Sequence, residues 1–196
     1  MSLVSFLSVW YQKQRAVAAL LIKKPEIAIS SWEHILDIKP GNTEALSALA
    51  HLHAEQGRKA KAMGILEQLV KQSPELSFNW FNLGFLQQES EQHELALHSF
   101  EQAIKLDEKS DRAFYGKALS LIKLGRIEEA IPLLKKNTEL QPMSPFGWYQ
   151  LAHAYHRLHQ TDRVAKVIRR LAEFEPKVAL QLERETGVIT NSAKTF

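Results

Sequence analysis

The chain has 196 residues, of which 45% are hydrophobic and 24% charged, a composition typical of a globular protein rather than a disordered one. It contains no cysteine, which excludes disulfides, thiol catalysis and cysteine-ligated metal sites and fits a reducing compartment such as the cytoplasm. The formal net charge of +3 comes from 25 basic and 22 acidic residues, a balance that does not indicate a nucleic-acid partner.

The first 22 residues contain two apolar stretches separated by charge. Residues 1–12 carry no charged side chain, and a second apolar stretch follows Lys13 and Arg15. Neither stretch reaches the roughly 18 residues that a membrane-spanning helix needs, and the positive charge follows the apolar stretch instead of preceding it as in a secretory signal. We therefore predict one helix over 2–22 whose apolar residues pack on the segment that follows.

An alternative places the same segment on a membrane surface. Residues 1–15 would then lie in the interface between lipid and water. The side chains in contact with lipid would be Leu3, Phe6, Leu7 and Trp10, and those facing the headgroups would be Lys13 and Arg15. This alternative predicts a weak membrane-surface contact and a location at the periphery of a membrane.

Residues of similar size recur at intervals of 34 positions from residue 9 to residue 178. One small column holds Ala16, Ala50, Gly84, Ala118 and Ala152, and a second holds Ala28, Ala62, Ala96, Ala130 and Val164. A large apolar column holds Trp32, Leu66, Phe100, Leu134 and Ile168, and a fourth holds Pro40, Pro74, Glu108, Pro142 and Pro176. Small residues let paired helices approach closely, large ones fill the gap to the next unit, and proline stops the second helix.

This pattern resembles the tetratricopeptide repeat family, and it is followed most closely at 77–110. The resemblance implies an all-α fold, a right-handed α-solenoid of helix–turn–helix repeats with a C-terminal capping helix. Its five repeats would cover 9–42, 43–76, 77–110, 111–144 and 145–178, with residues 1–8 extending the first helix. One departure is Asn137, which stands in a column that otherwise holds Ile35, Leu69, Ala103 and Leu171.

The last part of the chain predicts a cap for the repeats. Residues 177–186 read as a short amphipathic helix, and Gly187 is a plausible stop. We expect a capping helix over 179–187 that covers the last repeat, with Glu183 and Glu185 on its solvated side. Residues 188–196 are predicted to be a flexible tail.

The resemblance also implies that the first helix of each repeat lines a concave groove. Read at the groove positions of repeats 3 to 5, the candidate partner-binding residues are Phe78, Phe81, Asn82, Phe85, Arg112, Tyr115, Phe146, Tyr149, Gln150 and His153. Six of the ten are aromatic and are not required for core packing, which is typical of an interaction site. The amides among them can donate to and accept from a peptide backbone, and Arg112 suits a carboxylate.

We therefore expect an adaptor or scaffold that binds a peptide segment of a partner protein in the groove of repeats 3–5. The alternative function is a peripheral membrane assembly factor anchored by the N-terminal helix. Two other occupants of the groove stay open, namely the C-terminal tail and a second copy of the chain in a homo-oligomer.

No pattern of catalytic chemistry is recognisable. The sequence holds no nucleophile triad order, Gly-rich phosphate loop or HExxH motif, so we expect neither enzyme activity nor a cofactor. His153 and His156 are three residues apart and could share a metal ion, but two imidazoles without a third ligand make a weak site, and solvated or groove-lining histidines are favoured. The basic clusters near Arg58 and Arg163 lack interleaved aromatic residues, so no nucleic acid is expected.

Overall fold

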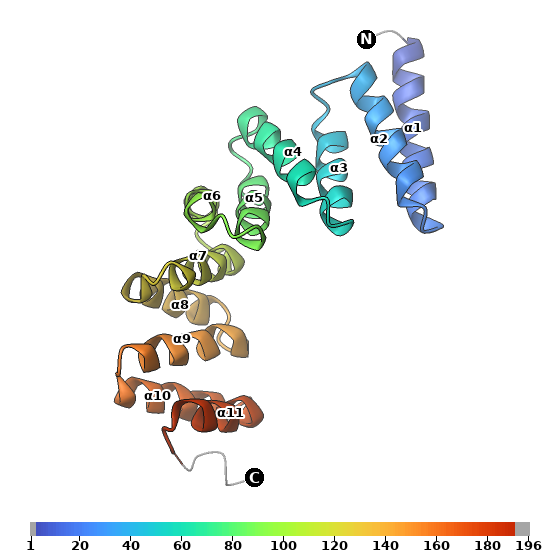
Figure 1. The fold of residues 1–196 in the computed structure, drawn as a ribbon. Coiled ribbons are helices and arrows are strands. Elements are labelled where there is room, and N and C mark those ends of the chain that lie inside the picture. The colour runs from blue at the N-terminus through green and yellow to red at the C-terminus, as the bar shows by residue number, and fades with distance from the viewer. Residues whose placement is uncertain (1–2, 191–196) are drawn as a thin grey trace. The chain divides into compact units, whose positions relative to one another are not determined.

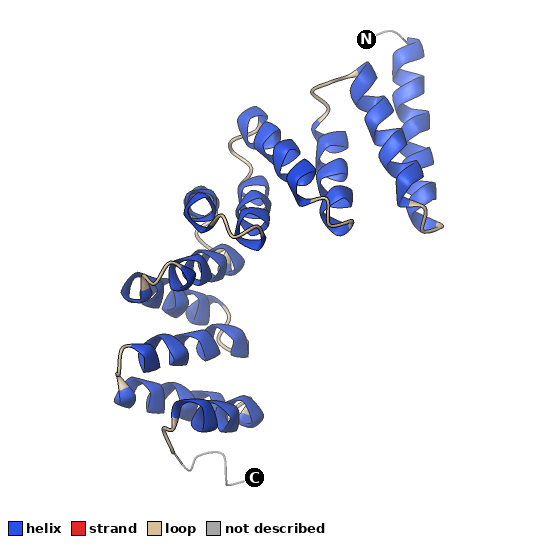
Figure 2. Ribbon diagram, viewed as in Figure 1, coloured by secondary structure: helices blue, strands red, loops and turns tan. Residues whose placement is uncertain are grey.

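The computed structural model describes residues 3–190, in which helices are joined by loops and no strand is present (Figure 1 and Figure 2). The helices are α1 (Leu3–Leu21), α2 (Pro25–Ile38), α3 (Thr43–Glu55), α4 (Lys59–Gln72), α5 (Ser77–Glu89), α6 (His93–Leu106), α7 (Asp111–Lys123), α8 (Ile127–Leu140), α9 (Pro145–Arg157), α10 (Thr161–Ala172) and α11 (Pro176–Thr186). Each of the five 34-residue segments holds all or most of a pair of these helices, although α1 begins before residue 9. The last helix, α11, begins at Pro176, within the last three residues of the fifth segment. The all-α prediction is confirmed.

The helices form two compact units, Met1–Ser90 with α1 to α5 and Glu91–Phe196 with α6 to α11. Within each unit, every helix packs against the helix that follows it in the chain, and α11 also contacts α9. The division falls inside the segment 77–110, because α5 belongs to the first unit and α6 to the second. The segment with the clearest sequence pattern is thus shared between two units.

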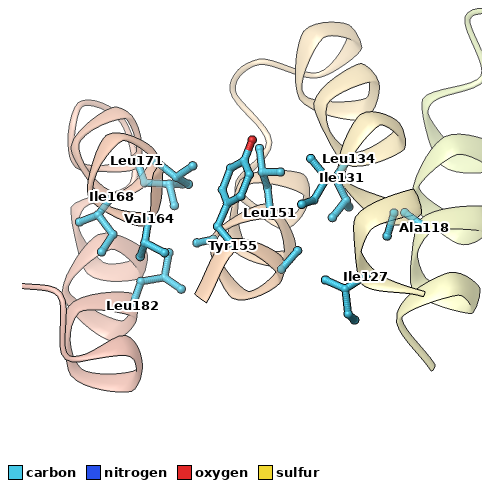
Figure 3. Packing of buried hydrophobic residues seen from close by; sticks show 14 of the residues in the cluster. Ala118, Ile127, Ile131, Leu134, Leu151, Tyr155, Val164, Ile168, Leu171 and Leu182 are labelled. Carbon is cyan, nitrogen blue, oxygen red and sulfur yellow. The ribbon is translucent and has the colours of Figure 1, made fainter. Parts of the chain in front are cut away.

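The columns of small and large residues form the core of both units. All five residues of the large column, from Trp32 to Ile168, are buried, and the second small column from Ala28 to Val164 has no exposed surface. Figure 3 shows this packing in the second unit, where Val164 of α10 and Leu182 of α11 lie beside Tyr155 of α9. The close helix approach expected from the small residues therefore accompanies a filled core.

One residue with a left-handed backbone lies between the two helices of each pair. The φ angle is 55° at Lys23, 71° at Gly57, 60° at Glu91, 79° at Gly125 and 56° at His159. These positions recur with the same 34-residue interval as the core columns. Only two of them are glycines, which adopt this conformation without the steric cost that a Cβ atom imposes. The turn geometry therefore repeats even where the residue type does not.

The structure explains why Asn137 interrupts an apolar column. Asn137 is buried on α8, and its side-chain nitrogen donates to the backbone carbonyl of Asp111, 2.9 Å away, at the start of α7. On its other side lies Gly147 of α9, so close that a Cβ atom at that position would stand 2.1 Å from the Asn137 Oδ1. The amide joins α7 and α8, and the glycine gives it the necessary room.

The capping helix α11 begins at Pro176 and ends before Gly187, which has a φ of 72°. Its residues Ala179 and Leu182 are fully buried against the second unit. The sequence-based placement of Glu183 in solvent is wrong, because this side chain is buried. Its Oε1 accepts hydrogen bonds from the backbone nitrogen and the hydroxyl of Thr190, both at 2.7 Å, and these donors replace water.

Part of the predicted tail 188–196 belongs with this cap. The backbone nitrogen of Thr190 donates a hydrogen bond to Glu183, and Val188 packs against the core of the second unit. Residues 191–196 lie outside the described residues, as do residues 1–2 at the other end of the chain.

The N-terminal helix α1 packs on its neighbours through small residues. Ala16 and Ala19 are buried and Val9 is partly buried in a cluster with residues of α2 and α3. The large apolar side chains of α1 are exposed instead, so the prediction that they pack on the following segment is wrong. Small residues on the packed side let the helices approach closely, which leaves the large ones on the opposite side.

Candidate functional site

The ten candidate partner-binding residues lie on the first helices of three pairs and belong to both units. Four of them are on α5 in the first unit. The other six are on α7 and α9 in the second unit. Each unit therefore carries its own group of candidate residues.

The α5 group is an exposed aromatic face. Phe78, Phe81, Asn82 and Phe85 are spaced by three or four residues, so they share one side of the helix, while Leu83 lies in the core on the other side. Phe78 is 64% exposed and Phe85 46% exposed, and Phe81 and Asn82 are half-buried. The rings of Phe81 and Phe85 stack with their centroids 6.4 Å apart. The structure thus brings all four residues together on one surface.

On α7 and α9, the candidate residues differ in burial. Tyr115 lies half-buried against the core of the second unit. Burial raises the pKa of the Tyr115 hydroxyl above its ordinary value, so the phenol stays protonated at neutral pH. Arg112 and Phe146 are exposed, Phe146 by 69%.

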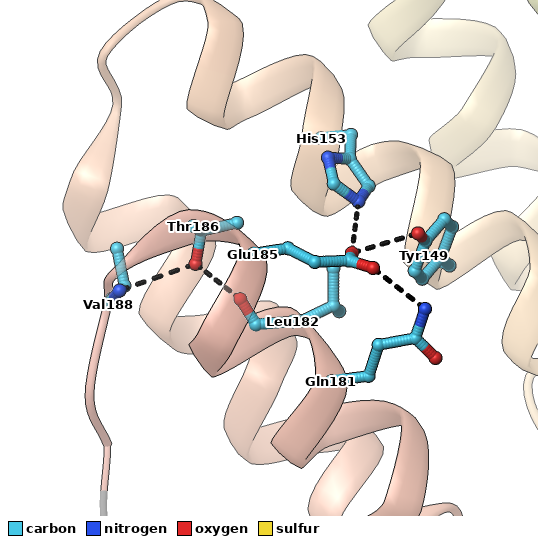
Figure 4. Close-up of polar contacts among 7 residues, drawn as sticks. All are labelled: Tyr149, His153, Gln181, Leu182, Glu185, Thr186 and Val188. Carbon is cyan, nitrogen blue, oxygen red and sulfur yellow. Dashed lines mark hydrogen bonds and ion pairs between the residues drawn. The ribbon is translucent and has the colours of Figure 1, made fainter.

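Two further candidates, Tyr149 and His153, are occupied by a carboxylate from the cap (Figure 4). The Tyr149 hydroxyl donates to Oε2 of Glu185 across 2.8 Å, and the His153 Nε2 lies 2.9 Å from the same oxygen. The side-chain nitrogen of Gln181, one turn earlier on α11, donates to Oε1 of Glu185 across 2.8 Å. The His153 ring also meets the Tyr149 ring edge-on, with centroids 4.6 Å apart.

These contacts have opposite effects on the two acids. The hydrogen bonds from Gln181 and Tyr149 hold the pKa of Glu185 below its usual range, so the carboxylate is ionised at neutral pH. Burial, and next the acceptor Glu185, raise the pKa of the Tyr149 hydroxyl. Glu185 is exposed, as expected, but its carboxylate is also bonded to Tyr149 and lies beside His153. Its spacing of four from Gln181 matches the spacing of Tyr149 and His153, but the sequence does not show that these two helix faces meet.

A second concave feature lies outside the ten candidates and has no sequence signal. It is a cavity of about 480 Å³ between α6, α7 and α8 in the second unit. Its lining residues are Leu97, His98, Glu101, Gln102, Lys105, Lys117, Leu121, Arg126, Glu129 and Leu133. Its charges pair with one another: Lys117 with Glu101, whose pKa is lowered mainly by this contact, and Arg126 with Glu129, joined by bonds of 2.6 and 2.7 Å. The charged groups of the wall therefore largely neutralise one another.

Residues 3–190 contain neither a cluster of three metal-ligating side chains nor a membrane-spanning helix. No group of three or more histidine, aspartate or glutamate side chains in this part of the chain is arranged to hold a metal ion. None of the described helices combines the length and the apolar character that crossing a bilayer requires.

Comparison with models of known protein families identifies the family of this chain. Two family models described as tetratricopeptide repeat match the chain, one over residues 23–83 and the other over residues 81–145. The chain belongs to the tetratricopeptide repeat (TPR) family. The family predicted from the 34-residue columns is thus confirmed.

Relatives of this TPR protein agree with the assignment. The TPR repeat-containing protein YpiA of Bacillus subtilis (strain 168) is 33% identical over 127 residues, which are 64% of this chain and 30% of YpiA. The chain therefore spans less than a third of the length of that relative.

Solved structures share the TPR fold. MamA from Desulfovibrio magneticus RS-1 has a TM-score of 0.77 at 18% identity, over 91% of this chain and 96% of the other. YrrB, described as a TPR protein with an unusual peptide-binding site, has a TM-score of 0.76 at 18% identity, over 86% of this chain and 88% of the other. At this level of identity the likeness shows the fold alone. That fold is an α-solenoid of TPR type.

Proposed function

We propose that this TPR protein is a non-catalytic adaptor that binds a peptide segment of a partner protein through the candidate residues of repeats 3–5, on α5 in the first unit and on α7 and α9 in the second unit. A role as a protein-interaction scaffold is supported by the TPR fold and by its structural neighbours, YrrB among them. The observation that carries the peptide proposal is the exposure of Phe78, Phe85 and Phe146 on first helices whose opposite sides form the core.

Aromatic side chains suit this role because they supply a large contact area and lose little conformational entropy on binding. On α5, the stacked pair of Phe81 and Phe85 offers a flat apolar surface, and Asn82 beside it can bond to a peptide backbone. On the second unit, exposed Phe146 and the charged group of Arg112 offer an apolar and an ionic contact. Each unit thus presents a contact area for a partner segment.

Contacts within the protein distinguish the candidate residues by how much each is expected to contribute to partner affinity. The polar groups of Tyr149 and His153 are bonded to Glu185, and Tyr115 lies half-buried against the core of the second unit. A partner would have to replace these bonds, whereas the exposed rings of Phe78, Phe85 and Phe146 carry no hydrogen-bonding groups and can be buried without breaking a hydrogen bond. We therefore expect the three phenylalanines to contribute most to affinity.

The test is a pull-down from native lysate followed by binding measurements with the purified partner. We compare wild type with Phe78→Ala/Phe85→Ala, with Phe146→Ala, and with Leu95→Ala. Leu95 is an apolar residue on α6 that is 56% exposed, so it controls for the loss of exposed apolar surface elsewhere. A partner retained by Leu95→Ala and lost by either phenylalanine variant supports the proposal. Equal capture by all four proteins contradicts it.

A second candidate function is attachment to a membrane surface, as a peripheral assembly factor held by the N-terminal helix. The observation that favours it is the exposure of the large apolar side chains of α1. Co-sedimentation with lipid vesicles tests it, by comparing the 196-residue chain with a shortened chain that begins at Arg15. Equal sedimentation of the two proteins would rule out the residues before Arg15 as the anchor.

A further inference from the structure

We propose, resting on the second candidate function, that the outer face of α1 is a docking surface for anionic lipid. Nine large apolar residues of this one helix are exposed, by between 43% and 80%. They are Leu3, Val4, Phe6, Leu7, Trp10, Tyr11, Val17, Leu20 and Leu21, and Ile22 follows directly. No other helix in residues 3–190 exposes more than two. We call this surface the outer face of α1.

The outer face is a consistent side of the helix and not a scatter of single residues. The packed side is made by Ala16 and Ala19, with Val9 and Gln12 partly buried between them and the N-terminus. The exposed apolar residues lie away from this packed side, over residues 3–11 and 17–21, and are separated by exposed Gln14 and Arg15. An apolar patch of this extent on a protein surface marks an interaction site.

The comparison with α3 shows that the outer face is particular to α1. Leu46 and Leu49 of α3 are buried, and the residues 34 positions earlier are Gln12 and Arg15. Where an inner helix buries leucine, α1 thus carries polar or charged side chains, while its own apolar residues lie at exposed positions. Much of the apolar surface of α1 is therefore turned away from the protein, as in a helix that lies on a membrane surface.

The charges around this face complement an anionic surface. Between residue 3 and residue 25 there are four cations and no acidic residue, and the first acid is Glu26. Lys13 is used inside the protein, since its Nζ lies 2.6 Å from a carboxylate oxygen of Glu44. Arg15, Lys23 and Lys24 are exposed, and no ion pair joins them to any residue in the described part of the chain. This changes the sequence-based assignment, in which Lys13 faced the headgroups.

The same charges argue against a second copy of the chain as the occupant. Two copies that met through this face would bring together the cations of both and no acidic residue of α1, which is unfavourable. An anionic bilayer suits both the apolar side chains and the cations of this face. Leu7 and its neighbours would contact acyl chains, and the cations would contact headgroup phosphates. Trp10 and Tyr11 suit the boundary between these two regions. Because α1 is not apolar enough to cross a bilayer, it would lie in the plane of the surface.

The experiment measures co-sedimentation of the 196-residue protein with vesicles of phosphatidylcholine alone and of phosphatidylcholine mixed with phosphatidylglycerol. Leu7→Ser/Trp10→Ser removes apolar surface, and Lys23→Glu/Lys24→Glu reverses charge. Leu95→Ser and Lys123→Glu/Lys135→Glu are the matched controls, because these exposed residues lie in the second unit. Thermal unfolding monitored by circular dichroism checks that every variant stays folded, which we expect since all the altered side chains are exposed.

We expect binding to the mixed vesicles that falls about tenfold or more in each α1 variant, persists in both controls and weakens at high salt. Equal binding to neutral vesicles that Lys23→Glu/Lys24→Glu leaves unchanged would overturn the anionic selectivity and keep membrane attachment. Absence of binding to both vesicle types would overturn both. A dimer in solution that Leu7→Ser/Trp10→Ser dissociates, without vesicle binding, would assign the outer face to a second copy of the chain.

Discussion

The hydroxyl of Tyr149 on α9 donates to the carboxylate of Glu185 on α11 across 2.8 Å, and His153 reaches the same oxygen. A residue of the capping helix therefore occupies part of the surface that the repeat pattern assigns to a partner. In the capping helix, Leu182 closes the apolar core. Glu185 accepts a hydrogen bond from Tyr149 of α9, the first helix of the last pair. A partner that reaches Tyr149 competes with a contact inside the protein.

The first prediction concerns the ionisation of Tyr149. Replacing Glu185 by glutamine removes the negative charge beside the phenol, so the pKa of Tyr149 should fall toward its ordinary value. The fall should be partial, because burial is the larger cause of the raised pKa and stays in place. Nuclear magnetic resonance of the tyrosine ring carbons measures this pKa directly. Tyr115, whose pKa is raised by burial and not by Glu185, serves as the internal control and should not change.

The second prediction is a pH dependence of stability. The pKa of Glu185 is lowered in the folded state, so its carboxylate stabilises the fold above its ordinary pKa and loses this contribution as the pH falls through the lowered value. Wild type should therefore be more stable than Glu185→Gln at pH 7. The difference should begin to shrink near the ordinary glutamate pKa of about 4.3 and vanish once the pH is below the lowered value. Urea unfolding of both proteins across this range gives the difference. A constant difference at all pH values would mean that the carboxylate charge is unimportant.

The sequence predicts the core of this protein well because the residues that recur every 34 positions are also the residues that are buried. Ala28 and Ile168 are buried as their columns require, since each helix pair repeats the same packing. On α1 the sequence is apolar on most sides, so its pattern does not indicate which side packs, and the structure selects the small residues Ala16 and Ala19. The bond between Tyr149 and Glu185 depends on how α11 meets α9, which no spacing along the chain specifies.

The third prediction follows from the left-handed turn residues. Glu91 and His159 adopt φ angles of 60° and 56°, which glycine tolerates better, so Glu91→Gly or His159→Gly should stabilise the protein by about 1 kcal/mol. The reverse change, Gly125→Ala, should destabilise it by about 1 kcal/mol through backbone strain alone, since no atom lies within 4 Å of the added methyl group. Equilibrium urea unfolding measures these differences.

The matched control is Gly64→Ala on α4. This glycine lies inside a helix and also has open space around it, so alanine there should stabilise by about 0.5–1 kcal/mol. Opposite signs for Gly64→Ala and Gly125→Ala would separate backbone strain from a general effect of adding a methyl group. If Gly125→Ala were neutral, the left-handed conformation at these turns would carry no measurable cost.

The last prediction tests the contact between Asn137 and Gly147. Alanine at position 147 would place its Cβ 2.1 Å from the Asn137 Oδ1, and the amide is held by its bond to Asp111, so Gly147→Ala should destabilise by about 2 kcal/mol. Asn137→Ala should cost about 1–2 kcal/mol, because it removes a buried hydrogen bond.

In the double variant Asn137→Ala/Gly147→Ala the new methyl group enters space that the amide has left. Its destabilisation should therefore be smaller than the sum of the two single changes by about 1 kcal/mol or more. Unfolding free energies of the four proteins complete the cycle. Additive effects would show that the two residues act independently, and the departure of Asn137 from its apolar column would then need a cause other than its fit against Gly147.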